Sequence, residues 1–361
     1  MESKYKVIGL MSGTSLDGLD IASCTFSQNP DGWSYSIEHA ITIEYDDQWK
    51  SRLKNLMQAS AEELAKTDFD FGYYCGEASK KFISEHKLKP DFISSHGHTI
   101  FHQPLKGFTY QIGNGAAIAA KAGIPVVNDF RSLDVALGGQ GAPLVPIGDK
   151  LLFSEYDFCL NLGGISNISF DHLQKRLAFD ICPVNIILNY LSQKEGKEYD
   201  QGGTMAFSGQ CNELLLGELN KLAFYNEKFP KSLGREWIDL QVIPLIEKFN
   251  LSIPDTLNTF CHHIAIQINH ITLQYSNNYG AKVLTTGGGA FNNFLINLMN
   301  EKAEGKVRYV VPEKGIVMFK EALIFAFLGV LRMLELPNCL SSVTGAAMNN
   351  IGGSVYIAGK N

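Results

Sequence analysis

The chain has 361 residues, about two and a half times the length of a common domain, so its length favours two domains. Hydrophobic residues make up 45% of it and charged residues 19%, a balance that excludes disorder as a description of the whole chain. The formal net charge of −6 argues against a general nucleic-acid binder, because such a surface repels phosphate backbones.

Targeting signals and membrane segments are not evident in the sequence. Residues 1–6 are polar and lead directly into an apolar stretch without a cleavage site. The apolar run 322–331 is ten residues long, half of what a membrane span needs, and predicts a buried helix. The seven cysteines are widely spaced and contain no C-x-x-C pair. We therefore expect reduced thiols in a cytoplasmic protein.

The first part of the chain predicts a β-hairpin followed by alternating strands and helices. Apolar, β-prone stretches flank a turn at residues 12–18. Further elements are expected from the spacing of apolar residues and from local composition. They are a third strand at 33–43, helices at 47–66 and 70–87, a strand at 91–95, a helix at 116–122 and a strand at 125–128.

A similar pattern begins again near residue 157. It predicts strands at 158–162, 168–170 and 176–180, a helix at 185–191, a strand at 282–286 and a helix at 290–300. Because each half begins with a hairpin and continues in alternating β and α, we expect two α/β domains with mixed sheets around an interdomain cleft. The predicted limits are 1–132, with a return segment at about 340–361, for the first domain and 133–339 for the second.

Glycine, at 34 residues, exceeds its usual share of roughly 7%, and the excess is clustered in turns. The first cluster has the G-x-x-x-x-G spacing of a phosphate-binding loop, but Leu19 and Asp20 stand where that loop needs Lys and Ser/Thr. No dinucleotide fingerprint occurs either. A hairpin turn with free amides and hydroxyls can still hold phosphate. Its alternative is a solvated β-turn.

Carboxylates in the first turn suit a magnesium ion. Asp17 and Asp20 are the expected ligands, because Mg²⁺ prefers one or two carboxylates together with water and phosphate. A second turn at 163–167 and a third at 287–289 are also rich in glycine, which lets a flat ligand approach the backbone. Together the three turns predict a nucleotide in an interdomain cleft. The expected nucleotide-binding residues are Gly13, Thr14, Ser15, Leu16, Asp17, Gly18, Leu19, Asp20, Gly163, Gly164, Ser166, Asn167, Gly287, Gly288 and Gly289.

The ordered motifs closely resemble the anhydro-N-acetylmuramic acid kinases. The first, GLMSGTSLDGLD at 9–20, is highly specific. The others are SHGHT at 95–99, QIGN at 111–114, DFR at 129–131, GGQGAPLVP at 138–146, NLGGISN at 161–167, GGGAFN at 287–292 and KEA at 320–322. The resemblance covers essentially the whole chain. It implies two actin-like (ribonuclease H-like) ATPase domains, as in the actin, sugar-kinase and heat-shock-chaperone ATPase superfamily.

The resemblance also implies a reaction of cell-wall (peptidoglycan) recycling. Such enzymes convert 1,6-anhydro-N-acetylmuramic acid, ATP and water into N-acetylmuramic acid 6-phosphate and ADP. Asp180 matches the family's catalytic aspartate, and a base is needed there to take a proton from the attacking water. Its alternative role is to cap the helix that follows. The family resemblance further suggests a homodimer.

Four residues match positions that the family uses for the sugar: His98, Thr99, Arg131 and Glu321. An arginine fork suits the lactyl carboxylate of muramic acid. Its alternative is a surface ion pair with Asp129 or Asp134. Glu321 opens an apolar helix and is expected at the mouth of the cleft. The alternative role of Glu321 is that of an acidic residue at the N-terminus of a helix, where the helix dipole favours a negative charge.

The sequence departs from the family pattern at two places. Cys182 and Val184 flank the proline after Asp180, where the family has glycines, and His98 stands where glutamine is common. A histidine there could become charged below about pH 6.5. His96, His98 and His102 have a poor spacing for zinc, so we expect no metal site from them.

Two other functions stay open from the sequence. One is a kinase of the same fold for another anhydrosugar such as levoglucosan, which lacks the lactyl carboxylate. The other is an actin-like or chaperone-like ATPase module that hydrolyses ATP without a sugar.

Overall fold

A computed structural model describes residues 3–30, 32–229, 231–276, 278–357 and 359. The chain divides into two compact units. Unit 1 comprises Met1–Leu152 and Phe319–Asn361, and unit 2 comprises Phe153–Met318. Among the described residues, no helix has both the length and the apolar character needed to cross a bilayer.

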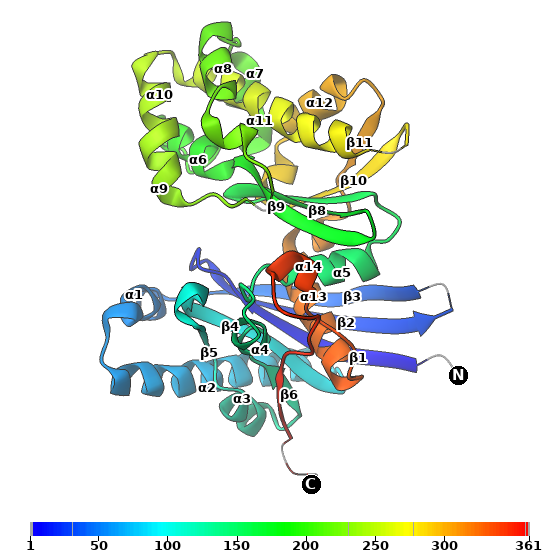
Figure 1. Ribbon diagram of the computed structural model, residues 1–361. Helices are drawn as coiled ribbons and strands as arrows, with labels where there is room; N and C mark the ends of the chain where they lie inside the picture. The colour runs from blue at the N-terminus through cyan, green and yellow to red at the C-terminus, as the bar shows by residue number, and fades with distance from the viewer. Residues whose placement is uncertain (1–2, 31, 230, 277, 358, 360–361) are drawn as a thin grey trace. The chain divides into compact units, whose positions relative to one another are not determined.

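Unit 1 is built on one mixed sheet with the strand order β12-β6-β4-β1-β2-β3, and β5 pairs with β4 (Figure 1). Strands β1, β2 and β3 are antiparallel neighbours, whereas β4 and β6 continue the sheet in parallel with β1. The strands are β1 (Ser3–Ser12), β2 (Gly18–Asn29), β3 (Gly32–Glu44), β4 (Phe92–Gln103), β5 (Phe108–Ile112), β6 (Val126–Asn128) and β12 (Ser354–Tyr356).

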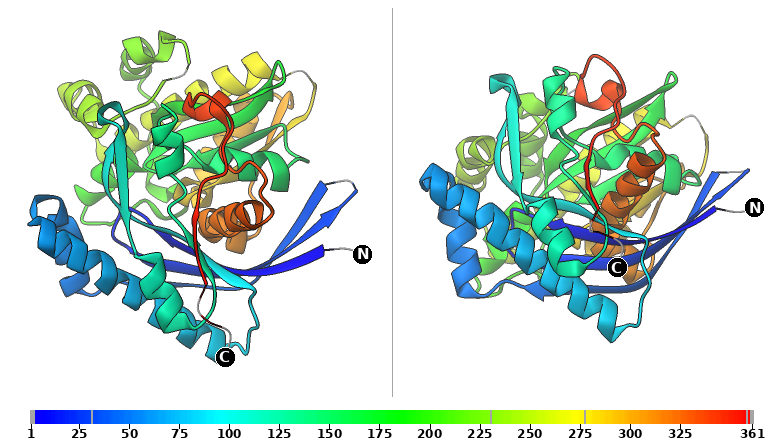
Figure 2. Two further views of the ribbon diagram at one scale, coloured as in Figure 1. Left: turned by 60° about the horizontal axis from the view of Figure 1, so that its bottom comes forward. Right: turned by 90° about the horizontal axis from the view of Figure 1, so that it is seen from below.

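Helices pack on both faces of this sheet (Figure 2). The helices of unit 1 are α1 (Asp47–Asn55), α2 (Ala61–Glu85), α3 (Gly115–Ala122), α4 (Ser132–Ala136), α5 (Val145–Leu152), the greater part of α13 (Lys314–Met333) and α14 (Ser341–Thr344). The alternation of side chains along β1 explains the two faces. Ile8 and Leu10 enter the core with α2 and α3, whereas a Cβ at Gly9 would lie 2.1 Å from the carbonyl oxygen of Ala322 in α13. The glycine therefore lets α13 lie directly against the strand.

Unit 2 repeats the central strand order with its own sheet, β11-β10-β7-β8-β9. The strands β7 (Phe158–Leu162), β8 (Ile165–His172) and β9 (Lys175–Pro183) are antiparallel, while β10 (Ala281–Thr286) and β11 (Val307–Val310) are parallel to β7. The order β9-β8-β7-β10-β11 thus matches β3-β2-β1-β4-β6 of unit 1. The prediction of two α/β units with mixed sheets is confirmed.

The helices of unit 2 include one long buried helix. They are α6 (Asn185–Gln193), α7 (Thr204–Ser208), α8 (Glu213–Asn220), α9 (Arg235–Trp237), α10 (Ile243–Lys248), α11 (Ile253–Tyr275) and α12 (Asn293–Lys302). Helix α11 contributes Leu257, Phe260, Ile264 and Ile268 to the core that also holds the inner faces of β7 and β8. Helix α11 is buried along nearly its whole length, and its buried Asn258 and Asn269 side chains donate to backbone carbonyls.

The compact units differ from the predicted domain limits at both junctions. Unit 1 extends to Leu152 rather than to 132, and it resumes at Phe319 rather than near 340. The second junction coincides with a break in α13 at Phe319, whose φ of −116° and ψ of 15° are not helical. The helix expected to open at Glu321 therefore begins earlier, at Lys314, and the boundary between the units falls at its break.

Local boundaries also differ from the predictions. The helix expected at 47–66 ends at Asn55, and α2 begins at Ala61 because the Ser60 hydroxyl accepts a hydrogen bond from the Glu63 amide at 3.1 Å. The strand expected at 91–95 extends to Gln103 as β4. Strand β5, which pairs with that extension, was not predicted.

Candidate functional site

The turn between β1 and β2 is an exposed turn that is fixed at its base. The amide of Leu16 donates to the carbonyl of Gly13 at 3.3 Å, and Leu16 itself has a φ of 63°. Its side chain packs against the core of unit 1. A Cβ at Gly18 would lie 2.4 Å from the carbonyl oxygen of Ile43 in β3. Thr14 and Ser15 remain exposed, so this turn can offer hydroxyls to a ligand.

The two carboxylates of this turn lie in different environments. Asp17 is exposed, whereas Asp20 is half-buried and accepts a hydrogen bond from the Thr42 hydroxyl at 2.5 Å. Burial raises the pKa of Asp20, and the charge of Asp17 raises it further. A divalent cation would relieve this repulsion, so the pair fits Mg²⁺ bound with help from phosphates and water. No cluster of three acidic, histidine or cysteine ligands occurs within the described part of the chain.

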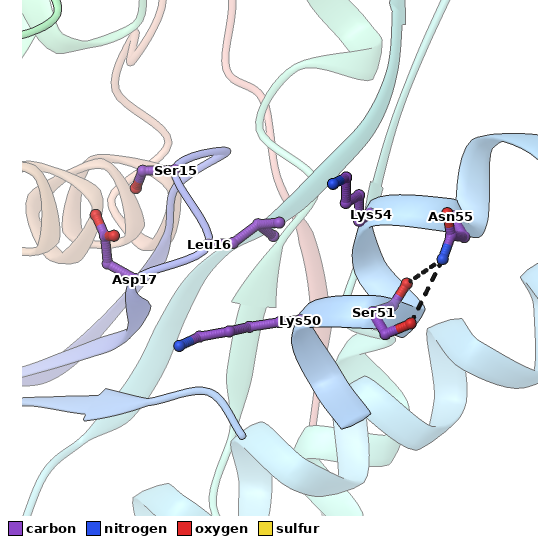
Figure 3. A pocket seen from close by; sticks show the side chains of 7 residues that line it. All are labelled: Ser15, Leu16, Asp17, Lys50, Ser51, Lys54 and Asn55. Carbon is purple, nitrogen blue, oxygen red and sulfur yellow. Dashed lines mark hydrogen bonds between the residues drawn. The ribbon is translucent and has the colours of Figure 1, made fainter. Parts of the chain in front are cut away.

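An open pocket lies between this turn and α1 (Figure 3). It is lined by Ser15, Leu16, Asp17, Lys50, Ser51, Lys54 and Asn55. Lys50 and Lys54 are one helical turn apart and therefore share a face of α1. Sequence reasoning missed both lysines, although their spacing in α1 could have indicated a basic face.

His98 links the first turn to β4. Its Nδ1 lies 2.8 Å from the hydroxyl of Ser12, and that hydroxyl lies 2.6 Å from the hydroxyl of Tyr45. Burial lowers the pKa of His98 to about 4. The expectation that His98 could gain charge below about pH 6.5 is therefore wrong. Thr99 follows on β4 and is half-buried.

Arg131 does not form the surface ion pair that was its alternative role. Its Nε and Nη2 lie 3.1 and 2.9 Å from Nε2 of His96, and its Nη1 donates to the carbonyl of Gly141 at 2.6 Å. Asp129 instead accepts from the Ser132 amide, and Asp134 from the Gly141 amide. The guanidinium is thus held by neutral groups, and burial lowers its pKa to about 10, so it stays charged at neutral pH.

Glu321 lies just after the break in α13, where the second helical segment begins. Glu321 is exposed, yet the protein groups around it raise its pKa by desolvation, while the charges of Lys320 and Arg131 oppose that rise. Lys320 forms a 2.7 Å ion pair with Asp149 of α5, and both side chains are buried. Glu321 therefore shares its surroundings with Arg131 and Asp20, two other residues predicted for the site.

In unit 2, Asp180 lies in β9 and is half-buried. Its Oδ2 accepts hydrogen bonds from the amide of Leu233 at 2.9 Å and the hydroxyl of Ser232 at 3.1 Å. Burial raises the pKa of Asp180, and these two bonds partly offset the rise. Helix α6 begins at Asn185, with Val184 at its N-cap. The alternative that Asp180 caps this helix is therefore wrong.

The residues flanking Pro183 lie at the end of β9. Val184 has a φ of −130° and a ψ of −96°, a combination outside the usual α and β regions. The Cys182 amide donates to the hydroxyl of Ser166 at 3.2 Å, where the β8–β9 register shifts. The Ser166 hydroxyl in turn donates to the Cys182 carbonyl at 2.9 Å. The buried Ser166 hydroxyl is therefore engaged within the sheet, whereas Asn167 is exposed.

The β7–β8 turn is held by the start of α6. The carbonyls of Gly163 and Gly164 accept from the amides of Asn185 and Val184 at 3.2 and 2.8 Å. The position of this turn is thereby fixed relative to β9.

The three glycines after β10 serve different purposes. A Cβ at Gly287, whose φ is 81°, would lie 2.5 Å from Oδ1 of Asn161, and one at Gly289 would lie 2.7 Å from Cβ of Leu162. At Gly288, which is exposed, the nearest atom would be 3.4 Å away. Gly287 and Gly289 therefore allow close packing against β7, and only Gly288 has the open backbone expected for contact with a flat ligand.

The three histidines of the 96–102 segment do not assemble a metal site. His96 contacts Arg131, His98 contacts Ser12, and Nδ1 of His102 lies 3.1 Å from the Thr109 hydroxyl.

Comparisons with known proteins place these features in a family. The family model described as anhydro-N-acetylmuramic acid kinase matches residues 5–358. The anhydro-N-acetylmuramic acid kinase of Shewanella loihica is 33% identical, over 98% of this chain and 99% of that protein. The enzyme of the same name from Pseudomonas fluorescens is 34% identical, over 97% and 98%.

A weaker likeness exists to a solved structure. The activator of the 2-hydroxyisocaproyl-CoA dehydratase from Clostridium difficile, with bound ADPNP, has a TM-score of 0.43 and 12% identity, over 93% of this chain and 97% of that one.

The matched family defines the class of this protein, an ATP-dependent kinase. More narrowly, the chain belongs to the anhydro-N-acetylmuramic acid kinase family.

Proposed function

We propose that this chain converts 1,6-anhydro-N-acetylmuramic acid, ATP and water into N-acetylmuramic acid 6-phosphate and ADP. The observation that carries the proposal is the family match over residues 5–358, together with a carboxylate at position 180 whose environment suits a base. The reaction belongs to the recycling of peptidoglycan, and we propose that the enzyme acts in the cytoplasm as a homodimer.

Asp180 is the proposed base. Its carboxylate takes a proton from a water molecule as that water attacks the anomeric carbon, and the bond from this carbon to the oxygen on C6 breaks. That oxygen then accepts the γ-phosphoryl group of ATP. The hydrogen bonds from Leu233 and Ser232 to Oδ2 fix the carboxylate, and its raised pKa makes it a stronger base than an exposed aspartate.

The glycine-rich turns are the proposed contacts of the nucleotide. In unit 1, the exposed hydroxyls of Thr14 and Ser15 suit phosphate oxygens. Asp17 and Asp20 would hold Mg²⁺, which when bound neutralises charge on the phosphates. In unit 2, the turn at 163–167 and the open backbone at Gly288 are the corresponding candidates.

His98, Thr99, Arg131 and Glu321 are the proposed contacts of the sugar. Arg131 keeps its charge and lies near Glu321, so a carboxylate ligand and hydroxyl groups can both be bound there. The buried, neutral His98 suits a sugar hydroxyl rather than an anion.

Mass spectrometry of the product tests this function. The enzyme is incubated with ATP, Mg²⁺ and 1,6-anhydro-N-acetylmuramic acid, and the product should be heavier than the sugar by one water and one phosphoryl group. A product that gains only the phosphoryl group, or an unchanged sugar beside released ADP, would contradict the proposal.

The oligomeric state is tested separately. Size-exclusion chromatography with light scattering should give twice the chain mass of 39.9 kDa, and a monomer at catalytic concentrations would contradict the proposed homodimer.

A further inference from the structure

The guanidinium of Arg131 has two N–H groups left over after its internal bonds. Its Nε and Nη2 donate to Nε2 of His96, and its Nη1 donates to the carbonyl of Gly141. A guanidinium carries five N–H groups, and these bonds use one from each nitrogen. Within the described part of the chain, one N–H on each terminal nitrogen remains for a ligand, and charge-assisted bonds from such donors favour a carboxylate.

His96 can hold Arg131 only as a neutral ring in one tautomer. Its Nδ1 lies 2.9 Å from the carbonyl oxygen of Gly97. Because a carbonyl accepts and a guanidinium donates, Nδ1 carries the hydrogen and Nε2 the lone pair. The ring is buried and its centroid lies 4.4 Å from that of Phe325. Burial and the charge of Arg131 lower the pKa of His96 well below its usual value.

The second acceptor of Arg131, the carbonyl of Gly141, is also held in place by hydrogen bonds. The amide of Gly141 donates to Oδ2 of Asp134 at 2.8 Å. Asp134 is fully buried, and its Oδ1 accepts from the side chains of Thr344 and Asn350, both at 2.8 Å. The carbonyl that receives Nη1 is therefore fixed to the C-terminal segment of unit 1.

We propose that His96 is a positioning residue that orients the Arg131 guanidinium for the carboxylate of the sugar. It would thereby select anhydrosugars that carry a lactyl carboxylate over those that lack it. The proposal rests on the function given above. A neutral acceptor suits this task, because a carboxylate in the place of His96 would neutralise the charge that the substrate needs.

Steady-state kinetics with two sugars test the proposal. One is 1,6-anhydro-N-acetylmuramic acid, and the other is 1,6-anhydro-N-acetylglucosamine, which lacks the lactyl group. In His96→Leu we expect KM for the muramic sugar to rise about 10- to 100-fold, the scale of a charge-assisted bond. The KM for ATP, the KM for the glucosamine sugar and kcat should change less than about threefold. His96→Gln, whose side-chain carbonyl can accept from Arg131, should restore most of the affinity.

A double-mutant cycle with Arg131→Ala separates positioning from a general structural effect. If His96 acts through Arg131, His96→Leu should add almost nothing to KM in the Arg131→Ala background. His263→Leu is the matched control. It removes another fully buried histidine, bonded to Asn220 and Tyr225 of unit 2, and should leave the ratio of the two sugar KM values unchanged.

Three results would overturn the proposal: additive effects in the cycle, an equal rise of KM for both sugars, or a glutamine variant as impaired as the leucine variant. If His96→Leu does not fold, KM for the muramic sugar is compared between His96→Gln and His96→Asn. The asparagine side chain is shorter and does not reach Arg131, so KM should be higher in His96→Asn. Equal KM values for these two would contradict the proposal. Failure of the proposed function is distinct, since the wild-type enzyme would then not respond to the muramic sugar at all.

Discussion

The hydroxyl of Ser12 lies 2.8 Å from Nδ1 of His98. This bond joins the first residue of the glycine-rich turn to the strand that carries a predicted sugar contact. Because the Tyr45 hydroxyl lies 2.6 Å from the same Ser12 hydroxyl, the start of the turn is fixed from β4 and from the segment after β3. The residue before the proposed phosphate contacts is thus hydrogen-bonded directly to a proposed sugar contact.

Protonation of His98 should weaken the fold in mild acid. The folded protein keeps His98 neutral down to about pH 4, whereas an unfolded chain binds this proton near pH 6.5. Lowering the pH through that window therefore favours the unfolded state, by up to about 3 kcal/mol. The variant His98→Gln can still form a hydrogen bond with Ser12. On unfolding it should bind about one proton fewer than the wild-type protein does. Urea titrations between pH 7 and 4 measure this, and identical pH profiles would contradict it.

Replacement of Asp180 should affect the chemical step more than nucleotide binding. Asp180→Asn keeps the shape of the side chain but removes the base, so we expect kcat to fall at least about a hundredfold. Calorimetry should show ADP affinity nearly unchanged. Ser232→Ala is the control, because it removes one hydrogen bond to Oδ2 and leaves the carboxylate; its kcat should fall far less. Retained turnover in Asp180→Asn would refute this assignment.

Binding of the muramic sugar should depend on the planar guanidinium of Arg131 as well as on its charge. Arg131→Lys keeps a cation but loses the paired donors, so KM for the muramic sugar should rise about 10- to 100-fold. Activity on levoglucosan, which has no carboxylate, should barely change. A parallel loss with both sugars would show that the substitution damages the fold instead.

The glycines after β10 should divide into a structural and a functional class. Gly287→Ala places a Cβ 2.5 Å from Asn161 at a φ of 81° and should lower the free energy of unfolding by about 1–3 kcal/mol. Gly288→Ala places a Cβ in ordinary van der Waals contact, 3.4 Å from Nδ2 of Asn185, and should leave stability nearly unchanged while raising KM for ATP. Urea denaturation and ATP kinetics on both variants test this. Equal stability losses would contradict the division.

Much of the fold follows from local patterns in the sequence. The turns at 12–18 and 163–167 are rich in glycine and lie between β-prone stretches. In the structure each of them connects the two strands of an antiparallel hairpin. The continuation of β4 to Gln103 was missed because its partner β5 is distant in sequence and pairs through tertiary contacts. The helical turn before the break at Phe319 was missed because it is too short to show a helical period in the sequence.

The sequence predicted candidate residues of the site, but it did not predict which residues form hydrogen bonds with them. The sequence pointed to Arg131 and Asp180, but their partners His96, Ser232 and Leu233 are separated from them by 35 to 53 positions. No local pattern connects such residues. The role of Ser166 shows the same limit, since only the β8–β9 register reveals that its hydroxyl is engaged with Cys182.

The initial rate of ADP release tests the central claim most directly. It is measured in three parallel reactions, with 1,6-anhydro-N-acetylmuramic acid, with levoglucosan and without sugar. We predict rapid release only with the muramic sugar. Equal release in all three reactions would identify a sugar-independent ATPase, and faster release with levoglucosan would identify a different anhydrosugar kinase; either result would contradict the account.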